Sequence, residues 1–404
     1  MSRLQDLIAQ LCPNGVPYKT LGEVCVAETG QQLNRSSLLE EGEIPVYNGG
    51  TKPSGFWHEA NMPANTITIS QGGASAGFVQ YIKVPFWAGA HCYTVSLSSP
   101  DLCYKFLYYF LKVNEPALMT SKQGAGIPGL NRRAIYALRI PVPPRVVQEE
   151  IARILDGFTA LEAELEAELE ARKKQYAYWR VRLLSFGQSA LAPIVPTVSV
   201  DWVPLGEIAT ITRGGSLQKK DLRDAGVPAF HYGQIYTRYG VSARETFSYV
   251  TSEVAKRQRM AQPNDLVMAV TSENVEDVCK CVAWIGKEAA AVSGHTAIIH
   301  HKQNAKFLSY YFQTFLFFDQ KRRLAHGTKV VEVTPEDLKR IRIPLPPLAE
   351  QERIVGVLDR FEALCGDLGD GLPREIALRR KQMAYWRERL LAFRELDEAE
   401  EARA

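Results

Sequence analysis

The sequence predicts an α+β protein in which two tandem mixed α/β domains are each followed by a long helix. Two observations predict this fold class: two blocks carry heptad-spaced apolar residues, and an internal repeat returns the same residues in the second half of the chain. Turn residues break the rest into short strand-like runs. The expected segments are a first domain over 1–147, a helix over 148–186, a linker and second domain over 187–347, and a second helix and tail over 348–404.

The repeat is strongest where each domain passes into its helix. The matched segments are Ile140–Pro144 with Ile343–Pro347, Gln148–Glu149 with Gln351–Glu352, Lys174–Gln175 with Lys381–Gln382, Tyr178–Arg180 with Tyr385–Arg387, and Leu183–Leu184 with Leu390–Leu391. Weaker matches between the two halves lie upstream. They pair Leu21–Glu23 with Leu205–Glu207, Gly89–His91 with Ser293–His295, and Tyr108–Phe110 with Tyr310–Phe312.

The first helix is expected from about Gln148 to Phe186, roughly 55–60 Å long. Its apolar seam has heptad spacing with one four-residue step, and glutamates fill the solvent side. The seam residues are Ile151, Ile154, Phe158, Leu161, Leu165, Leu169, Tyr176, Trp179, Leu183 and Phe186.

The second helix has its own seam, interrupted by Gly369, Gly371 and Pro373, where we expect a break or kink. Two narrow seams in one chain most simply bury each other as an antiparallel pair; the alternative is that each helix packs on its own domain. The second seam comprises Ile354, Val357, Phe361, Leu364, Leu368, Ile376, Met383, Trp386, Leu390 and Phe393.

Within the domains, short runs predict strands and helices separated by turns. Expected strands are Ile44–Tyr47, Thr66–Ile69, Gly77–Tyr81 and Leu266–Val270; expected helices are Tyr104–Leu111 and Ala305–Phe318; Gly187–Ser199, with Pro193 and Pro196, is a candidate linker. His300 and His301 would point to opposite faces of a strand, a poor arrangement for a metal site.

The composition of the chain limits the classes of function that it can have. The sequence has no stretch of about 18 apolar residues, so no membrane span is predicted, and the start of the chain lacks the features of a secretory signal. Seven scattered cysteines fit no zinc or redox spacing, so they are expected to be free thiols in a reducing cytoplasm. Residues 1–147 carry 12 basic and 9 acidic side chains, and 187–347 carry 20 and 15, whereas the helical blocks carry 6 against 8 and 10 against 13. Mildly basic domains suit a polyanion, although the differences are small.

No catalytic signature is apparent. The Gly-rich run Gln71–Gly77 lacks the Lys-Ser/Thr of a phosphate-binding loop and is better explained as a turn. Pro143–Pro144 and Pro346–Pro347 follow Val142 and Leu345, which cannot hold an amino group as an adenine methyltransferase motif does. His91 and His295 recur between the halves and are expected to be structural. We therefore expect no catalytic and no metal-binding residues.

Nucleic-acid signals are modest. The loop Ser121–Gly126 and its counterpart His326–Lys329 carry cations and amides suited to phosphate anchoring and base-edge reading, although such loops are often simply solvated. The candidate DNA-binding residues are Lys52, Gln71, Lys122, Gln123, Arg238, Lys321, Arg322, Arg323 and Lys329.

Together these segments resemble a known family. The run Leu11–Val16 leading into Leu21–Glu23, both Pro-Pro-to-helix segments, Gly371–Pro373 and both Lys-Gln…Tyr-Trp-Arg helix ends are similar to the specificity subunits of type I restriction–modification systems. The resemblance spans nearly the whole chain. It implies that each variable domain, a target-recognition domain, reads one half of a bipartite, asymmetric DNA site, and that the system combines DNA methylation with phage defence.

The resemblance also implies partners. In this family the helices space the domains and dock two modification subunits, which bind S-adenosylmethionine and methylate adenine. Motor-nuclease subunits that use ATP and Mg²⁺ join for cleavage. No cofactor is expected on this chain. The candidate partner-binding residues are Gln148, Arg153, Tyr178, Trp179, Arg180, Gln351, Arg353, Tyr385, Trp386 and Arg387.

Three other functions stay open at the level of the sequence. The chain could be an enzyme acting alone, although it lacks cofactor and metal motifs. It could be a coiled-coil adaptor that never touches DNA, or a specificity subunit of a system that only methylates. The recognition sequence and its spacer length cannot be derived from the residues.

Overall fold

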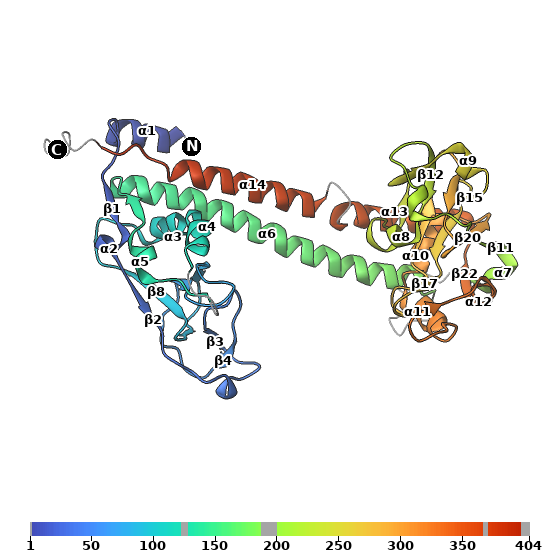
Figure 1. The fold of residues 1–404 in the computed structure, drawn as a ribbon, viewed down its shortest axis with the longest axis horizontal. Coiled ribbons are helices and arrows are strands. Elements are labelled where there is room, and N and C mark those ends of the chain that lie inside the picture. The colour runs from blue at the N-terminus through green and yellow to red at the C-terminus, as the bar shows by residue number, and fades with distance from the viewer. Residues whose placement is uncertain (1, 123–127, 187–199, 367–370, 397–404) are drawn as a thin grey trace. The chain divides into compact units, whose positions relative to one another are not determined.

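The computed structural model describes residues 2–122, 128–186, 200–366 and 371–396. The chain forms two compact units, Met1–Leu165 with Ile376–Ala404, and Glu166–Glu375. Each unit combines one mixed α/β domain with parts of the long helices, as Figure 1 shows. The long helices are α6 (Arg145–Leu184), α13 (Leu348–Cys365) and α14 (Leu372–Leu390).

The first domain is built on an antiparallel four-stranded sheet in the order β2-β8-β5-β6, with a three-stranded sheet β4-β3-β7 beside it. The central strand β5 is buried at every position, and its Ile67 and Ile69 belong to the main hydrophobic cluster. The strands are β1 (Tyr18–Thr20), β2 (Cys25–Thr29), β3 (Ile44–Tyr47), β4 (Gly55–Trp57), β5 (Thr66–Ser70), β6 (Val79–Ile82), β7 (Trp87–Ala88), β8 (Cys92–Leu97) and β9 (Arg139–Pro141). The helices are α1 (Ser2–Leu11), α2 (Leu21–Val24), η1 (Arg35–Ser37), α3 (Tyr104–Val113), α4 (Glu115–Thr120) and α5 (Arg132–Tyr136).

The second domain repeats this plan. Its five-stranded sheet has the order β11-β20-β16-β18-β13, and a second sheet has the order β14-β12-β19-β15. The strands are β10 (Asp201–Pro204), β11 (Ala209–Arg213), β12 (Val227–Phe230), β13 (Ser242–Ala243), β14 (Ser248–Val250), β15 (Arg259–Ala261), β16 (Leu266–Ala269), β17 (Thr271–Ser272), β18 (Cys281–Trp284), β19 (Ala290–Val292), β20 (Thr296–His301), β21 (Val331–Glu332) and β22 (Arg342–Leu345). The helices are α7 (Leu205–Ile208), η2 (Lys219–Asp221), α8 (Tyr232–Thr237), α9 (Ser252–Ala255), α10 (Ala305–Tyr311), α11 (Phe315–Arg322) and α12 (Pro335–Lys339).

Both predicted long helices are present. Helix α6 begins three residues before the predicted Gln148, directly after Pro144, and ends two before Phe186. The second helix is divided as expected: α13 ends at Cys365, and α14 restarts at Leu372 with Pro373 in its first turn, where a missing N–H costs nothing. The seam residue Leu368 and the interrupting Gly369 lie outside the described residues.

The two seams meet inside each unit, and they also enter the domain cores. In the first unit, α6 and α14 run side by side in opposite directions (Figure 1), with Glu162 and Arg380 paired at 2.6 Å. Ile151 of α6 and Leu390 of α14 belong to the first domain's main hydrophobic cluster. In the second unit, the Tyr176 ring stacks on Phe361 of α13 at 6.0 Å. The antiparallel pairing is therefore confirmed within each unit, and the alternative of packing on the domains is also partly right.

A repeated polar contact fastens each domain to the helix that follows it. Tyr109 O–H and Lys105 Nζ of α3 donate to Asp156 of α6, at 2.6 and 3.0 Å. Tyr310 O–H of α10 donates to Asp359 of α13 at 2.8 Å, and Lys306 Nζ does so at 2.5 Å. Tyr109 thus corresponds to Tyr310, so the predicted match of Tyr108–Phe110 with Tyr310–Phe312 is wrong by one residue.

Two predicted elements differ from the structure. The helix expected over Ala305–Phe318 is two helices, because α10 ends at Tyr311 and Thr314 caps α11 by accepting the N–H of Phe317. The strand expected from Gly77 begins at Val79, because Gly77 has a φ of 95° and lies against the backbone of α4. The linker candidate Gly187–Ser199 is outside the described residues. Among the helices described, none is both long and apolar enough to span a membrane.

His300 and His301 point to opposite faces of β20, as predicted: His300 is exposed, whereas His301 is 6% exposed. The N–H of Gln303 donates to His301 Nδ1 at 3.1 Å, and His301 Nε2 is buried without a hydrogen-bond partner. Burial lowers the pKa of His301 from 6.5 to about 4, so the ring is neutral in the folded protein at pH 7.

We expect the stability of the second unit to fall as the pH falls from about 6.5 to about 4. In that range the unfolded chain takes up a proton at residue 301 and the folded chain does not. The loss attributable to His301 approaches roughly 3 kcal/mol at pH 4. His301→Asn keeps an acceptor for Gln303 but does not titrate. Urea unfolding across this pH range should give a shallower pH dependence for the variant; equal slopes would contradict the assignment.

Candidate nucleic-acid interface

In the first domain, three loops gather at one end of the central sheet. Strands β5 and β8 pair with Ser70 opposite Cys92, so the residues following β5 and preceding β8 emerge together. The N–H of Gln71 donates to His91 O at 2.9 Å. The loop after β3 joins them, because the N–H of His91 donates to Asn48 Oδ1 at 3.1 Å. Residues 48–52, 71–75 and 89–91 form what we call the first loop cluster.

The second domain has the same arrangement. Ala269 pairs with Thr296, so Val270 and His295 emerge at the same end of the sheet, and the N–H of Val270 donates to His295 O at 3.0 Å. The N–H of Tyr232, after β12, donates to Ser293 Oγ at 3.0 Å. Residues 231–232, 270–272 and 293–295 form the second loop cluster. The two loop clusters therefore share equivalent strand pairings but differ in their loop residues.

Two predicted cations lie at the first loop cluster. Lys122 Nζ donates to Ala74 O at 3.3 Å. Lys52 is exposed beside Thr51, whose carbonyl accepts from Gln80 at 2.7 Å. Gln71 is less suited to a DNA contact than the two lysines. Its amide donates to Tyr93 O–H at 3.0 Å, and its position in the sheet corresponds to that of buried Val270. Gln123 lies outside the described residues.

In the second domain, the predicted cations differ in whether a carboxylate offsets their charge. Lys329 is exposed in the turn between His326 and Glu332, whose backbones pair, and β21 joins β17 next to Thr271. Arg238 is exposed and lies 5.4 Å from the Phe247 ring centroid. Arg322 and Arg323 are exposed, but both pair with Asp319 at 2.6 Å, which offsets part of their charge.

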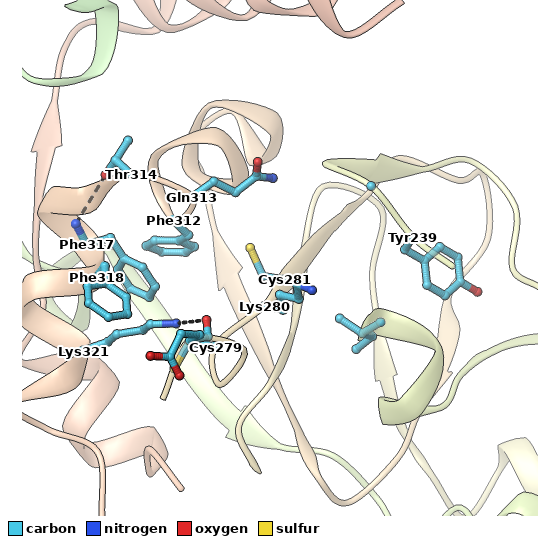
Figure 2. Close-up of a pocket in the computed structure, with 13 residues that line it drawn as sticks. Tyr239, Cys279, Lys280, Cys281, Phe312, Gln313, Thr314, Phe317, Phe318 and Lys321 are labelled. Atoms are coloured by element: carbon cyan, nitrogen blue, oxygen red, sulfur yellow. Dashed lines mark hydrogen bonds between the residues drawn. The ribbon is translucent and has the colours of Figure 1, made fainter. Parts of the chain in front are cut away.

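The prediction that Lys321 binds DNA is wrong. Lys321 is 5% exposed, and its ammonium donates to the carbonyls of Glu276 and Val278 at 2.8 and 2.5 Å. Figure 2 shows it reaching from α11 past Phe317 and Phe318 towards the chain at Cys279, at the edge of a pocket of about 350 Å³. Burial lowers the pKa of Lys321. The ammonium of Lys321 therefore stabilises the turn around Glu276 and Val278.

Sequence reasoning missed several cations near the loop clusters. Arg35 opens η1 and lines a pocket of about 400 Å³ with Asn48. Lys219 opens η2 at the corresponding place and lies close enough to His231 to lower its pKa, after the larger effect of burial. Arg213 donates to Gly294 O at 2.9 Å. The signal was available, because the match of Leu21–Glu23 with Leu205–Glu207 continues without a gap as far as Arg35 and Lys219.

The predicted partner-binding residues fall into two groups. The aromatic pairs recur on α6 and α14: Tyr178 is 38% and Tyr385 52% exposed, each accepting a hydrogen bond from an arginine four residues on. Trp179 and Trp386 pack partly against the hydrophobic clusters, with Arg180 and Arg387 partly buried beside them. Arg153 and Arg353 are exposed and pair with Glu150 and Glu350 at 2.7 Å.

The prediction for Gln148 and Gln351 is wrong, because both side chains are fully buried. Gln148 Oε1 accepts the N–H of Cys103 at 2.7 Å, and its amide donates to Asp101 O and Pro143 O at 2.8 and 2.7 Å. Gln351 Oε1 accepts the N–H of Asn304, and its amide donates to Pro346 O, as in the first domain, and to the side-chain Oε1 of Gln303. These glutamines join each domain to its helix and leave no polar atom for a partner.

The described residues offer few groups for metal binding or for thiol chemistry. They contain no group of three or more His, Cys, Asp or Glu side chains placed to hold a metal ion. All seven cysteines are free. Burial raises the pKa of Cys279 and of Cys281 to about 12, so neither thiol ionises near neutral pH.

Comparison with known proteins gives one consistent family. The model for the type I restriction modification DNA specificity domain matches twice, over residues 13–171 and 199–378. A putative type I restriction enzyme specificity subunit from Haemophilus influenzae is 26% identical over 94% of this chain and 96% of its own length. The Escherichia coli EcoR124I/EcoR124II specificity subunit is 32% identical over 63% of each chain.

Solved structures agree on the fold. The S subunit of the type I restriction–modification system from M. genitalium superposes with a TM-score of 0.58 at 18% identity, covering 93% of this chain and 95% of that one. A chain from a study of complex assembly and conformational transition in a type I system gives a TM-score of 0.53 at 18% identity, covering 94% and 98%.

Proposed function

Because the chain belongs to the family of type I restriction–modification DNA specificity proteins, we propose that its two domains read the two halves of one asymmetric DNA site. The observation that carries this proposal is the repeated loop cluster. Both domains present loops at the same end of the same sheet, and the exposed residues in them differ. Equivalent positions with different side chains suit two half-sites of different sequence.

The cations around the loop clusters would anchor the DNA backbone. We assign phosphate contacts to Lys52, Lys122 and Lys329, with Arg35 and Lys219 added from the structure, and weaker contributions to Arg238, Arg322 and Arg323. Gln123 keeps its place in this proposal from the sequence alone. Lysine and arginine contacts to phosphates fix the register of a protein on the duplex, while sequence is read at the base edges.

The helices would dock the enzymatic partners. The exposed Tyr178 and Tyr385, with Trp179, Trp386, Arg180, Arg387, Arg153 and Arg353 around them, offer two related surfaces for two modification subunits. We propose that the methyl donor S-adenosylmethionine, and the ATP and Mg²⁺ of a motor-nuclease, bind to partner subunits and not to this chain. The chain by itself would then be a non-catalytic subunit of a DNA adenine methyltransferase or restriction complex.

DNA binding by the complex of this chain with its modification subunits should weaken steeply with salt, since phosphate contacts release counterions. Lys122→Ala or Lys329→Ala should each reduce affinity by a few-fold to tenfold, on the order of 1 kcal/mol, and flatten the salt slope. Lys83→Ala, an exposed lysine outside the loop cluster, is the matched control. Salt-independent binding would favour an adaptor that does not touch DNA, and unchanged binding by both variants would remove these lysines from the interface.

A further inference from the structure

We propose that His91 and His295, one in each loop cluster, are specificity-determining residues that contact base edges. This inference rests on the proposed function and deepens it. The two histidines directly precede corresponding strands, β8 and β20, and both are exposed. The structural role expected from the sequence therefore does not account for them, because a histidine kept only for packing would be buried.

The second loop cluster holds His295 in a defined orientation. Thr271 Oγ1 lies 3.1 Å from His295 Nδ1, within hydrogen-bond distance, and the Tyr232 ring centroid lies 4.9 Å from that of the imidazole. Thr271 is 7% exposed, so its side chain is held in place by its surroundings. One ring nitrogen is thus engaged and one ring face is covered. The remaining nitrogen, Nε2, is the polar atom that His295 can offer to DNA.

In the first loop cluster, His91 takes the place of His295, but no hydroxyl takes the place of that of Thr271. Its backbone N–H is held by Asn48 Oδ1, and the sheet register places Gly72 where the second domain has Thr271. A Cβ added to Gly72 would lie 3.8 Å from His91 Nδ1 and would meet no other atom within 4 Å. Among the residues that the structure describes, no hydrogen bond engages either ring nitrogen of His91, whereas Thr271 engages one ring nitrogen of His295.

This difference gives the two histidines different reading properties. A neutral imidazole has one donor and one acceptor nitrogen, and the hydrogen bond made by one nitrogen sets the role of the other. If Thr271 donates to Nδ1, Nε2 becomes a donor suited to guanine O6 or N7; if Thr271 accepts, Nε2 becomes an acceptor suited to the amino group of adenine or cytosine. His91 has no such constraint from residue 72. The residue at this position, Thr271 in the second domain and Gly72 in the first, thus sets which hydrogen-bonding role the neighbouring histidine can take.

The test is selection of bound sequences from a randomised duplex DNA library by the full chain in complex with its modification subunits. His295→Ala should relax base preference by roughly tenfold at one or two adjacent positions of one half-site, leaving the other half-site unchanged. His91→Ala should do the same in the other half-site. Thr271→Val, which removes the hydroxyl at constant size, should alter preference at the position that His295→Ala relaxes. Gly72→Thr should alter the His91 position.

His300→Ala is the matched control. His300 is exposed on β20, the strand that follows His295, but it lies five residues further on, roughly 17 Å away at the spacing of an extended strand, and it pairs with Asp265. It should leave the selected sequence unchanged. A wild-type complex that selects no bipartite sequence would refute the proposed function itself. A normal wild-type selection that both His91→Ala and His295→Ala leave intact, or that His300→Ala relaxes equally, would refute only the assignment of these histidines.

Discussion

A chain shortened to residues 1–190 should form a homodimer whose complex with modification subunits methylates a palindrome. The first unit needs the end of α14 and the residue after it to complete its core, among them Trp386, Leu390 and Leu391. The shortened chain lacks them but keeps their sequence equivalents Trp179, Leu183 and Leu184 at the end of α6. In a dimer about a two-fold axis, each copy can supply that end to the other and cover the exposed apolar face.

Sedimentation of the shortened chain, followed by methylation mapping with its partners, checks this prediction. Two copies of one domain should read two copies of the first half-site. Leu183→Asp in the shortened chain is the control, because it places a charge where the missing Leu390 would lie and should return the protein to a monomer. A monodisperse monomer without that substitution, or a dimer that still reads the asymmetric site, would contradict the account.

Gln148→Ala and Gln351→Ala should each destabilise the protein by roughly 3–5 kcal/mol. Each substitution leaves three groups that hydrogen-bond the glutamine amide, one at a buried contact and two at part-buried ones, without that partner, and a buried group left so costs about 1–3 kcal/mol. Gln148→Glu should also be harmful although it has the same shape, because a carboxylate cannot donate to Asp101 O and Pro143 O.

Urea unfolding measures this effect, with Glu149→Ala as the control, since Glu149 is an exposed neighbour on the same helix. Unchanged stability of Gln148→Ala, combined with loss of modification-subunit binding, would restore the role as a partner contact that the sequence first suggested. Loss of stability with partner affinity retained in the folded fraction would support the buried junction seen here.

The elements with strong periodicity could be predicted from the sequence, whereas those that depend on single contacts could not. The seam of α6 and the restart at Pro373 follow from spacing and from the chemistry of proline. The division of Ala305–Phe318 depends on the cap at Thr314, which an apolar run conceals. The repeat itself was visible, but its register at Tyr109 and Tyr310 needed the contacts with Asp156 and Asp359.

The candidate site was harder to predict, for a physical reason. A lysine's residue type does not say whether its ammonium meets solvent or buried carbonyls, and Lys321 meets carbonyls. Residue type likewise gave no way to distinguish Gln148 and Gln351, which are buried, from exposed glutamines. Lys122 and Lys329 stay predictions: Lys122 lies at the first loop cluster, where its ammonium donates to Ala74 O, and Lys329 is exposed. His91 and His295 gained importance only when their exposure and the neighbouring Thr271 were known.

The central claim is that one domain reads one half-site. Methylome sequencing of a host that expresses the full chain with its modification subunits tests this most directly. If each domain reads one half-site, the methylome should show a single bipartite motif with two different halves separated by a fixed gap. A contiguous motif, or one whose two halves are identical, would contradict it.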